Sequence, residues 1–541
     1  MKGELLLQST DLHFGKGKTL ESGLEKCIRL LFAMVMTWIM VSVLFLTGVS
    51  FSRKKEFSIS NVWIAASAIV AIALFTVLSL ILMKKLGKKS RRNRIPLEER
   101  MDSYVRRLTV ILFLSEVYIS LSIFEANTWD PAVLWSTATS LVDGNEIWAD
   151  YFSTYPNNLF LLLFAVLMIR INRAVGVFSG NYGMMAVIII DCVTLCAACY
   201  LTYKVLSNLT NKKAAGCGFL ICVILAGLSP WMSVYYSDST AILIPILSLY
   251  LYSKPYKNCK MKQLGCLVAV IVSAIGYSIK PHCAILLIAF FCMEVVYAIK
   301  TKSKGRLLRA AMVAGIAIIS VTLNSALLIH QYESYGYKLD IEKERGMAHY
   351  FMMGLNQETG GTYSEEDCDL SAAQPTREAR KEENIRVSKQ RLSEMGFKGY
   401  LRHLNKKLLT AYHDGTFAWG MDGHSVGPVT EDLNLIMTPL LRSFYLTNGS
   451  RHELFKTIEQ IIWISTLVFT WILALGVPVR SCSFEFGVIM LSLIGLTLFQ
   501  LLFEVRARYL FLYIPFFCVA ATLGAEYYIR NTQRFIKKWV R

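Results

Sequence analysis

The chain has 541 residues, of which 54% are hydrophobic, and its formal net charge is +18. A mean hydropathy of +0.43 is too high for a soluble globular protein, and apolar runs of roughly 18 residues or more recur along the chain. The positive charge gathers in short loops and at the C-terminus. That distribution is typical of a polytopic membrane protein and argues against nucleic-acid binding.

The apolar runs predict an all-α membrane protein with about twelve transmembrane helices. The predicted spans are 27–48, 61–83, 107–124, 184–203, 215–230, 239–253, 264–279, 283–299, 308–330, 458–477, 484–503 and 507–528. One further run, 157–169, has about 13 residues, the length expected of a re-entrant or juxtamembrane helix rather than a span.

Basic loops predict the orientation of these spans. The loop 84–107 holds ten Lys and Arg residues, which places it in the cytoplasm. The loops 254–262 and 300–309 and the tail 530–541 agree, whereas Arg53, Lys54 and Lys55 oppose the assignment. We therefore expect a plasma-membrane protein with both termini in the cytoplasm.

Four segments follow from this topology. They are an N-terminal segment with two additional spans (1–106), a transmembrane core with its first outer loop at 125–157 (107–330), an extracytoplasmic loop domain (331–457), and the last spans with a basic tail (458–541). Within the loop domain, apolar residues recur at helical spacing over 383–412, with basic residues between them. This pattern predicts an amphipathic helix or helix pair that either lies on the membrane surface or packs on its own domain.

The first outer loop is purely acidic. Residues 125–157 include five carboxylates and no Lys or Arg, among them Glu125, Asp130 and Asp150. Other polar residues are predicted on the same face of the membrane: Asp238, Lys280, His282, Arg506 and Arg508. A carboxylate can take a proton from an acceptor hydroxyl, and cations stabilise charge on a leaving phosphate. The set fits group transfer from a phosphate-linked donor, which outside the cytoplasm would be carried by a lipid.

The order of these residues resembles the GT-C superfamily of multispanning glycosyltransferases, which includes protein O-mannosyltransferases and bacterial aminoarabinose transferases. A span precedes Asp130, and "YFSTYPNN" (151–158) leads into a short helix. "SPWMSVYYSDS" (229–239), "IKPH" (279–282) and an Arg-containing turn before the last span follow. The resemblance covers roughly 107–330 and 484–528.

The resemblance implies an inverting glycosyltransferase without a metal or other cofactor. Its donor would be a polyprenyl-phosphate sugar, and its acceptor an extracytoplasmic polymer, glycolipid or protein. Asp130 would be the catalytic base, and Lys280, His282, Arg506 and Arg508 would bind the donor phosphate. Many relatives have Asp-Glu where this chain has Asp-Pro, which leaves Glu125, Asp150 and Asp238 open as further acidic residues of the site.

The same residues also allow structural roles, and the chain also allows a different function. Asp130 precedes Pro131 and is also a good helix start. Lys280 and His282 can snorkel at the interface, and Arg506 and Arg508 can pair with Glu504. A transporter or flippase of a lipid-linked saccharide would also explain twelve spans. However, no pairing of halves is visible, and the ionisable residues concentrate at one face.

Overall fold

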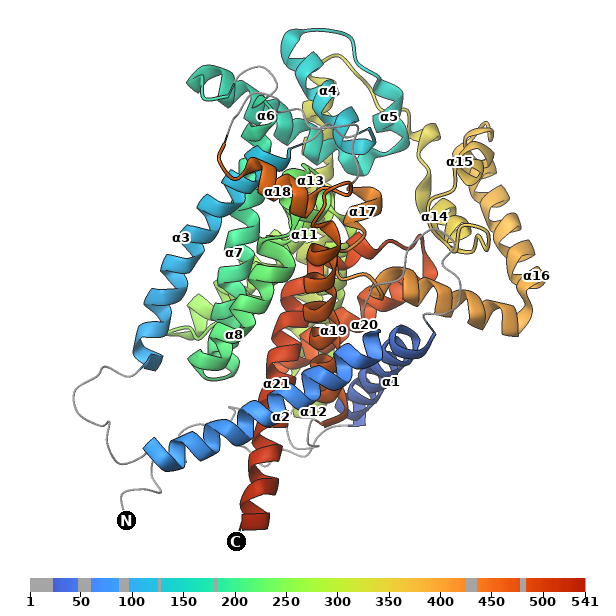
Figure 1. The fold of residues 1–541 in the computed structure, drawn as a ribbon. Coiled ribbons are helices and arrows are strands. Elements are labelled where there is room, and N and C mark those ends of the chain that lie inside the picture. Colours follow the sequence, from blue (N-terminus) through green and yellow to red (C-terminus); the bar gives the residue numbers. More distant parts are fainter. Residues whose placement is uncertain are drawn as a thin grey trace.

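The computed structural model describes residues 23–46, 60–86, 97–124, 128–178, 182–423, 435–476 and 483–540. Every regular element within these ranges is helical, which confirms the all-α prediction for them. Long helices form a bundle, and two further groups of helices lie outside it (Figure 1). One group, α4 to α6, covers one end of the bundle, and the other, α14 to α16, projects to one side.

Nine helical segments in the described ranges are long and apolar enough to cross a membrane. They are α1 (Gly23–Phe45), η1 with α6 (Pro156–Val175), α7 (Met185–Leu209), α11 (Cys259–Ile279), η5 with α12 (Pro281–Thr301), α13 (Lys304–Glu333), α19 (His452–Gly476), α20 (Phe484–Leu502) and η7 with α21 (Ala507–Ile536). The predicted total of twelve stays a prediction.

The remaining predicted spans correspond to helices outside these nine segments, most of which are short, interrupted or charged at one end. α2 spans Asn61–Leu86, and α3 spans Leu97–Ile123 and begins with a charged stretch. α8 (Lys212–Cys222) passes into a π-helical turn at Val223–Gly227. α9 (Ser237–Ala241) and α10 (Leu243–Ser253) are separate short helices.

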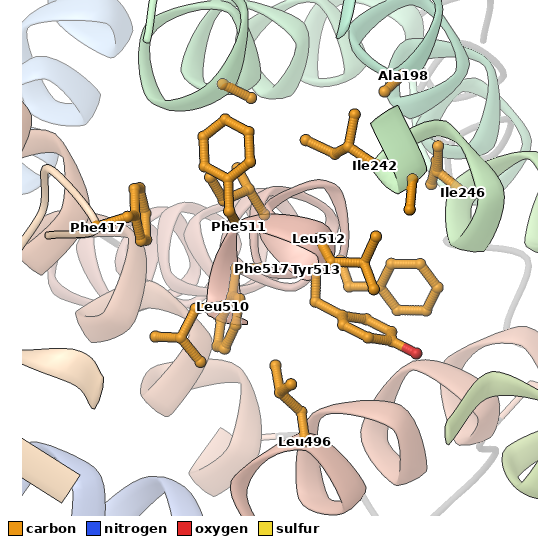
Figure 2. Close-up of a cluster of buried hydrophobic side chains, with 14 of the residues drawn as sticks. Ala198, Ile242, Ile246, Phe417, Leu496, Leu510, Phe511, Leu512, Tyr513 and Phe517 are labelled. Atoms are coloured by element: carbon orange, nitrogen blue, oxygen red, sulfur yellow. The ribbon is translucent and has the colours of Figure 1, made fainter. Parts of the chain in front are cut away.

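The last helix lies at the centre of the bundle. It begins with the 3₁₀ turn η7 (Ala507–Tyr513) and continues as α21 (Ile514–Val540). Phe511, Tyr513 and Phe517 are fully buried there among side chains of other helices, including Ile242 and Leu496 (Figure 2). η7 also carries Arg508, which is buried at the edge of this core and ion-paired with Asp238.

The acidic outer loop folds into two helices that lie beside α6. α4 (Asp130–Asp143) starts at Asp130 with Pro131 in its first turn, and α5 is Ala149–Thr154. Gly144 ends α4 with φ 74°, a conformation that glycine adopts without strain.

α6 is longer than its apolar run predicted. It spans Leu159–Val175, because the helix continues through Arg170 and Arg173. Its length therefore no longer excludes a crossing. Arg173 forms a 2.5 Å ion pair with Asp143 at the far end of α4, and α6 lies with α4 at one end of the bundle (Figure 1). This position agrees with a juxtamembrane helix.

The long loop holds α14 (Gly346–Gly354), α15 (Glu365–Ala372), α16 (Arg377–Tyr412), α17 (Trp419–Asp422) and α18 (Thr438–Tyr445). α16 confirms the predicted helix pair, since Gly396 interrupts it with φ 56° and ψ −179°. Its first half contacts α15, where Arg391 pairs with Asp367 at 2.6 Å. Its second half contacts α1, where Trp38 Nε1 donates to Asn405 Oδ1 at 2.6 Å.

Gly524 should be essential for packing of α21 against α19. A Cβ at this position would overlap the carbonyl of Phe469, and overpacking of this kind costs about 1–3 kcal/mol. We expect Gly524→Ala to lower the apparent Tm in detergent by several degrees. Gly315→Ala on α13, where a Cβ meets open space, should leave the Tm unchanged or slightly higher. Equal Tm values for both variants would contradict the packing.

Candidate active site

Asp130 is a half-buried carboxylate held by two tyrosines. It accepts hydrogen bonds from the Tyr151 hydroxyl at 2.7 Å and the Tyr236 hydroxyl at 2.6 Å, and Asn158 Nδ2 donates to the Tyr151 oxygen at 2.7 Å. Burial and the adjacent Asp130 charge raise the pKa of both tyrosines, so both remain donors. A carboxylate has about four lone-pair sites. Asp130 therefore keeps accepting capacity for a substrate hydroxyl.

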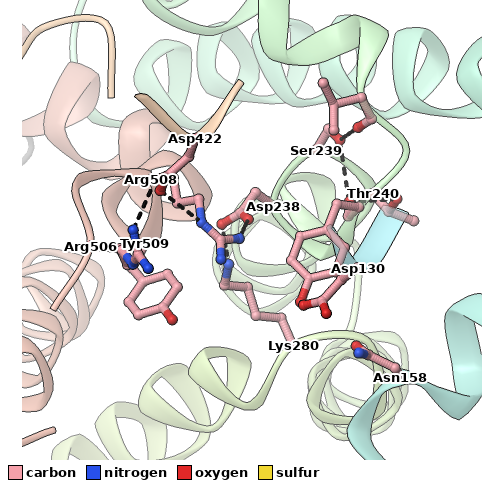
Figure 3. A network of polar contacts seen from close by, with 12 residues as sticks. Asp130, Asn158, Asp238, Ser239, Thr240, Lys280, Asp422, Arg506, Arg508 and Tyr509 are labelled. Atoms are coloured by element: carbon pink, nitrogen blue, oxygen red, sulfur yellow. Dashed lines mark hydrogen bonds and ion pairs between the residues drawn. The ribbon is translucent and has the colours of Figure 1, made fainter. Parts of the chain in front are cut away.

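Asp238 is a buried carboxylate between two cations. It is 1% exposed, pairs with Lys280, and accepts from Arg508 Nη1 at 2.8 Å (Figure 3). These three residues come from α9, from the turn between α11 and α12, and from η7. Burial and double pairing make Asp238 an anchor for the two cations rather than an accessible base.

Arg506 extends this cluster toward its partly exposed edge. Its Nη1 lies 2.9 Å from Asp422 and its Nε lies 3.1 Å from Glu504, while Asp422 also lies 3.3 Å from Arg508 Nε. The cluster thus balances Lys280, Arg506 and Arg508 against Asp238, Asp422 and Glu504. Within the described part of the chain, Nη2 of each guanidinium donates no hydrogen bond to the protein.

Aromatic rings join Asp130 to the cationic cluster. Arg508 Cζ lies 4.8 Å from the Trp129 ring centroid and 5.1 Å from that of Tyr236, and these two rings meet edge to face at 4.9 Å. Such contacts stabilise a guanidinium. Tyr236 therefore binds Asp130 with its hydroxyl and faces Arg508 with its ring.

The structure places His282 behind this cluster. Its ring lies 4.3 Å from Phe499 and 4.9 Å from Tyr509, and it is 6% exposed. Neither ring nitrogen has a hydrogen-bond partner within the described ranges. The Tyr509 ring therefore contacts both His282 and Lys280, since it lies 4.9 Å from Lys280 Nζ.

Of the acidic candidates, Asp150 does not join the site in the structure. Asp150 is exposed and pairs with Lys343 at 2.8 Å, and Glu125 lies outside the described residues. Conversely, Asp422, Tyr151, Tyr236 and Tyr509 belong to the site although no pattern singled them out as site residues. Glu504 was expected only as an ion-pair partner, and its pairing with Arg506 is confirmed. The run "SPWMSVYYSDS" did contain Tyr236, whereas Asp422 comes from the long loop and only the fold brings it close.

Intramembrane acids are structural in character. Asp191 accepts from Thr240 at 2.7 Å and Ser239 at 3.1 Å, as expected for a carboxylate with partners inside the bundle. Glu294 is also buried, and it accepts hydrogen bonds from Tyr252 at 2.6 Å and Arg306 at 3.1 Å within the bundle.

One carboxylate of the acidic run 364–369 is held by internal contacts. Asp367 is buried, paired with Arg391, and accepts from Asn356 Nδ2 at 3.1 Å. Over the ranges described above, no group of three or more His, Cys, Asp or Glu residues is arranged to hold a metal ion.

Residues 21–529 match a family described as a conserved hypothetical integral membrane protein. The match covers most of the chain, so this protein belongs to that family and is an integral membrane protein. No curated protein and no solved structure matches it.

Asp238 should be essential for stability, and an exposed aspartate offers a matched control. Asp238→Asn would leave Lys280 and Arg508 buried without their shared counter-charge, which costs about 3–5 kcal/mol. Asp143→Asn removes only the exposed pair with Arg173, and such pairs contribute little. We expect a large fall in apparent Tm for the first variant and none for the second. A similar Tm for both would contradict the buried ion cluster.

Proposed function

We propose that this protein is an integral-membrane glycosyltransferase that uses a polyprenyl-phosphate sugar and an extracytoplasmic acceptor. The proposal rests on one observation: a carboxylate and a cationic group lie on either side of the Trp129 and Tyr236 rings. Asp130 is a partly accessible carboxylate on one side, and guanidiniums with uncommitted N–H donors lie on the other. In this proposal the chain crosses the plasma membrane twelve times, with both termini in the cytoplasm and the site on the outer face.

Asp130 is the general base. Its two tyrosine hydrogen bonds hold the carboxylate in one orientation at the start of α4, and Pro131 stiffens that start. The acceptor hydroxyl donates its proton to a remaining lone pair of Asp130 as its oxygen attacks the anomeric carbon. Because the Asp130 carboxylate is already held in this orientation, it need not rearrange during the reaction.

The arginines bind the donor phosphate. The bond between the anomeric carbon and the phosphate oxygen breaks as the new glycosidic bond forms, and polyprenyl phosphate leaves with the electron pair. Nη2 of Arg506 and of Arg508 can donate to that phosphate while their other nitrogens stay paired with protein carboxylates. Charge-assisted hydrogen bonds from preset donors stabilise the leaving group.

The other residues of the cluster have supporting roles. Asp238 holds both Lys280 and Arg508 in place, and Asp422 and Glu504 do the same for Arg506. His282 packs against the Tyr509 ring and does not contact the phosphate. This differs from the role that the family resemblance implied for Lys280 and His282.

Asp130→Asn should abolish transfer. The amide keeps the size of the side chain and loses the basic oxygen, so turnover should fall at least about 100-fold, the usual contribution of a general base. The measurement is release of polyprenyl phosphate by the purified protein, supplied with a panel of polyprenyl-phosphate sugars. Asp150→Asn, on the same outer loop, should retain activity.

Three other outcomes would change the proposal. Equal turnover of Asp130→Asn and wild type would remove Asp130 as the base, and loss in Asp150→Asn alone would move the base there. Absence of turnover with every donor, together with movement of a labelled lipid-linked saccharide across liposomes, would establish a transporter instead.

A further inference from the structure

A pocket lies away from the ion cluster, between the end of α1 and the second half of α16. Its volume is about 300 Å³, and it is lined by Leu46, Lys398, Leu401, Arg402, Lys406 and Leu409, among others. Leu46 directly follows α1, a candidate membrane span. The pocket therefore opens where a span meets a helix of the long loop.

The cations of this pocket form one stripe. Lys398, Arg402 and Lys406 are spaced i, i+4 and i+8, so they lie on one face of α16. Residues 396–412 contain no Asp or Glu. No carboxylate of the described residues forms an ion pair with any of the three. Three like charges on one face repel one another, which favours an anion among them.

Exposed apolar side chains on the same half of α16 indicate that the anion belongs to a lipid. Phe397 is 78% exposed and Leu401 is 41% exposed, although both stand beside lysines and arginines on a helix outside the spans. A helix with exposed apolar residues and a basic face lies in the interface of a membrane. The apolar walls of the pocket, Leu46 and Leu409, continue this surface toward α1.

The walls of the pocket are held in place. Leu409 is 2% exposed, and Trp38 of α1 donates to Asn405 between the cationic residues. Lys406 Nζ also lies 3.3 Å from the Gln357 carbonyl. The Gly396 break sets the direction of the second half of α16 independently of the first.

We propose that this pocket binds the phosphate head of an anionic membrane phospholipid. Lys398, Arg402 and Lys406 bind the phosphate, and Leu46, Leu401 and Leu409 contact the first part of the acyl chains. Free phosphate shares the charge but has nothing to place against the leucines. The inference stands independently of the proposed transferase activity.

The test is a titration of the full-length protein in uncharged detergent. Phosphatidylglycerol, phosphatidylcholine and inorganic phosphate are added separately, and the apparent Tm is followed as a function of concentration. Phosphatidylglycerol should raise the Tm in a saturable way, because binding to the folded state stabilises it. Phosphatidylcholine and inorganic phosphate should have much smaller effects.

Variants that remove positive charge test whether phosphatidylglycerol binds at this pocket. Lys398→Gln/Arg402→Gln/Lys406→Gln should weaken phosphatidylglycerol binding about 100-fold, since each basic residue near anionic lipid contributes roughly fivefold. Arg402→Gln alone should weaken it about fivefold and serves if the triple variant folds poorly. Lys338→Gln/Lys381→Gln/Lys389→Gln removes the same charge from exposed positions elsewhere in the loop, and should bind as wild type.

Several results would overturn the proposal. One is no Tm shift of the wild type with phosphatidylglycerol. Another is an equal loss in the two triple variants, which would indicate diffuse attraction. Equal stabilisation by phosphatidylcholine would remove the role of charge, and equal stabilisation by inorganic phosphate would remove the lipid.

Discussion

The buried pairing of Asp238 with Lys280 and Arg508 is the interaction on which the site depends. It joins three segments far apart in the chain, and each supplies a charge that would be very costly to bury alone. Since both cations share one carboxylate, none of the three segments can move without exposing a charge to the apolar core around η7. The ion cluster thus sets the position of Arg508, and through the rings of Trp129 and Tyr236 it sets the distance to Asp130.

Two kinds of carboxylate follow from this arrangement. Asp238 and Glu504 are buried and committed to cations, whereas Asp130 is held by neutral hydroxyls and remains partly accessible. A carboxylate paired with a cation is a weak base, because the cation favours its ionised form. Of these three carboxylates, Asp130 is therefore the one whose surroundings suit the proposed proton transfer, and its position at a proline-started helix does not compete with that role.

Local sequence patterns predicted a large part of this structure. Apolar runs located the long helices, Asp130-Pro131 marked the start of α4, and apolar spacing over 383–412 predicted α16. Lys280, Arg506 and Arg508 were chosen from their predicted side of the membrane and from the family resemblance, and the fold does bring them together. Asp422 could not be predicted in this way, because its contact with Arg506 spans 84 positions and depends on the path of the long loop. The end of α6 was also missed, since helix formation continued past the apolar run through Arg170 and Arg173.

Lys407 connects the long loop to the site. It is fully buried and donates to the carbonyls of Gly354 at 2.8 Å and Phe503 at 2.6 Å, and burial lowers its pKa to about 7. Phe503 directly precedes Glu504, the partner of Arg506, while Lys406, which directly precedes Lys407 in α16, lines the pocket beside α1. One turn of α16 thus contacts both the basic pocket and the segment that carries the arginines. A displacement of this turn would alter the hydrogen bonds to Phe503, so the long loop is part of the framework that positions the arginines.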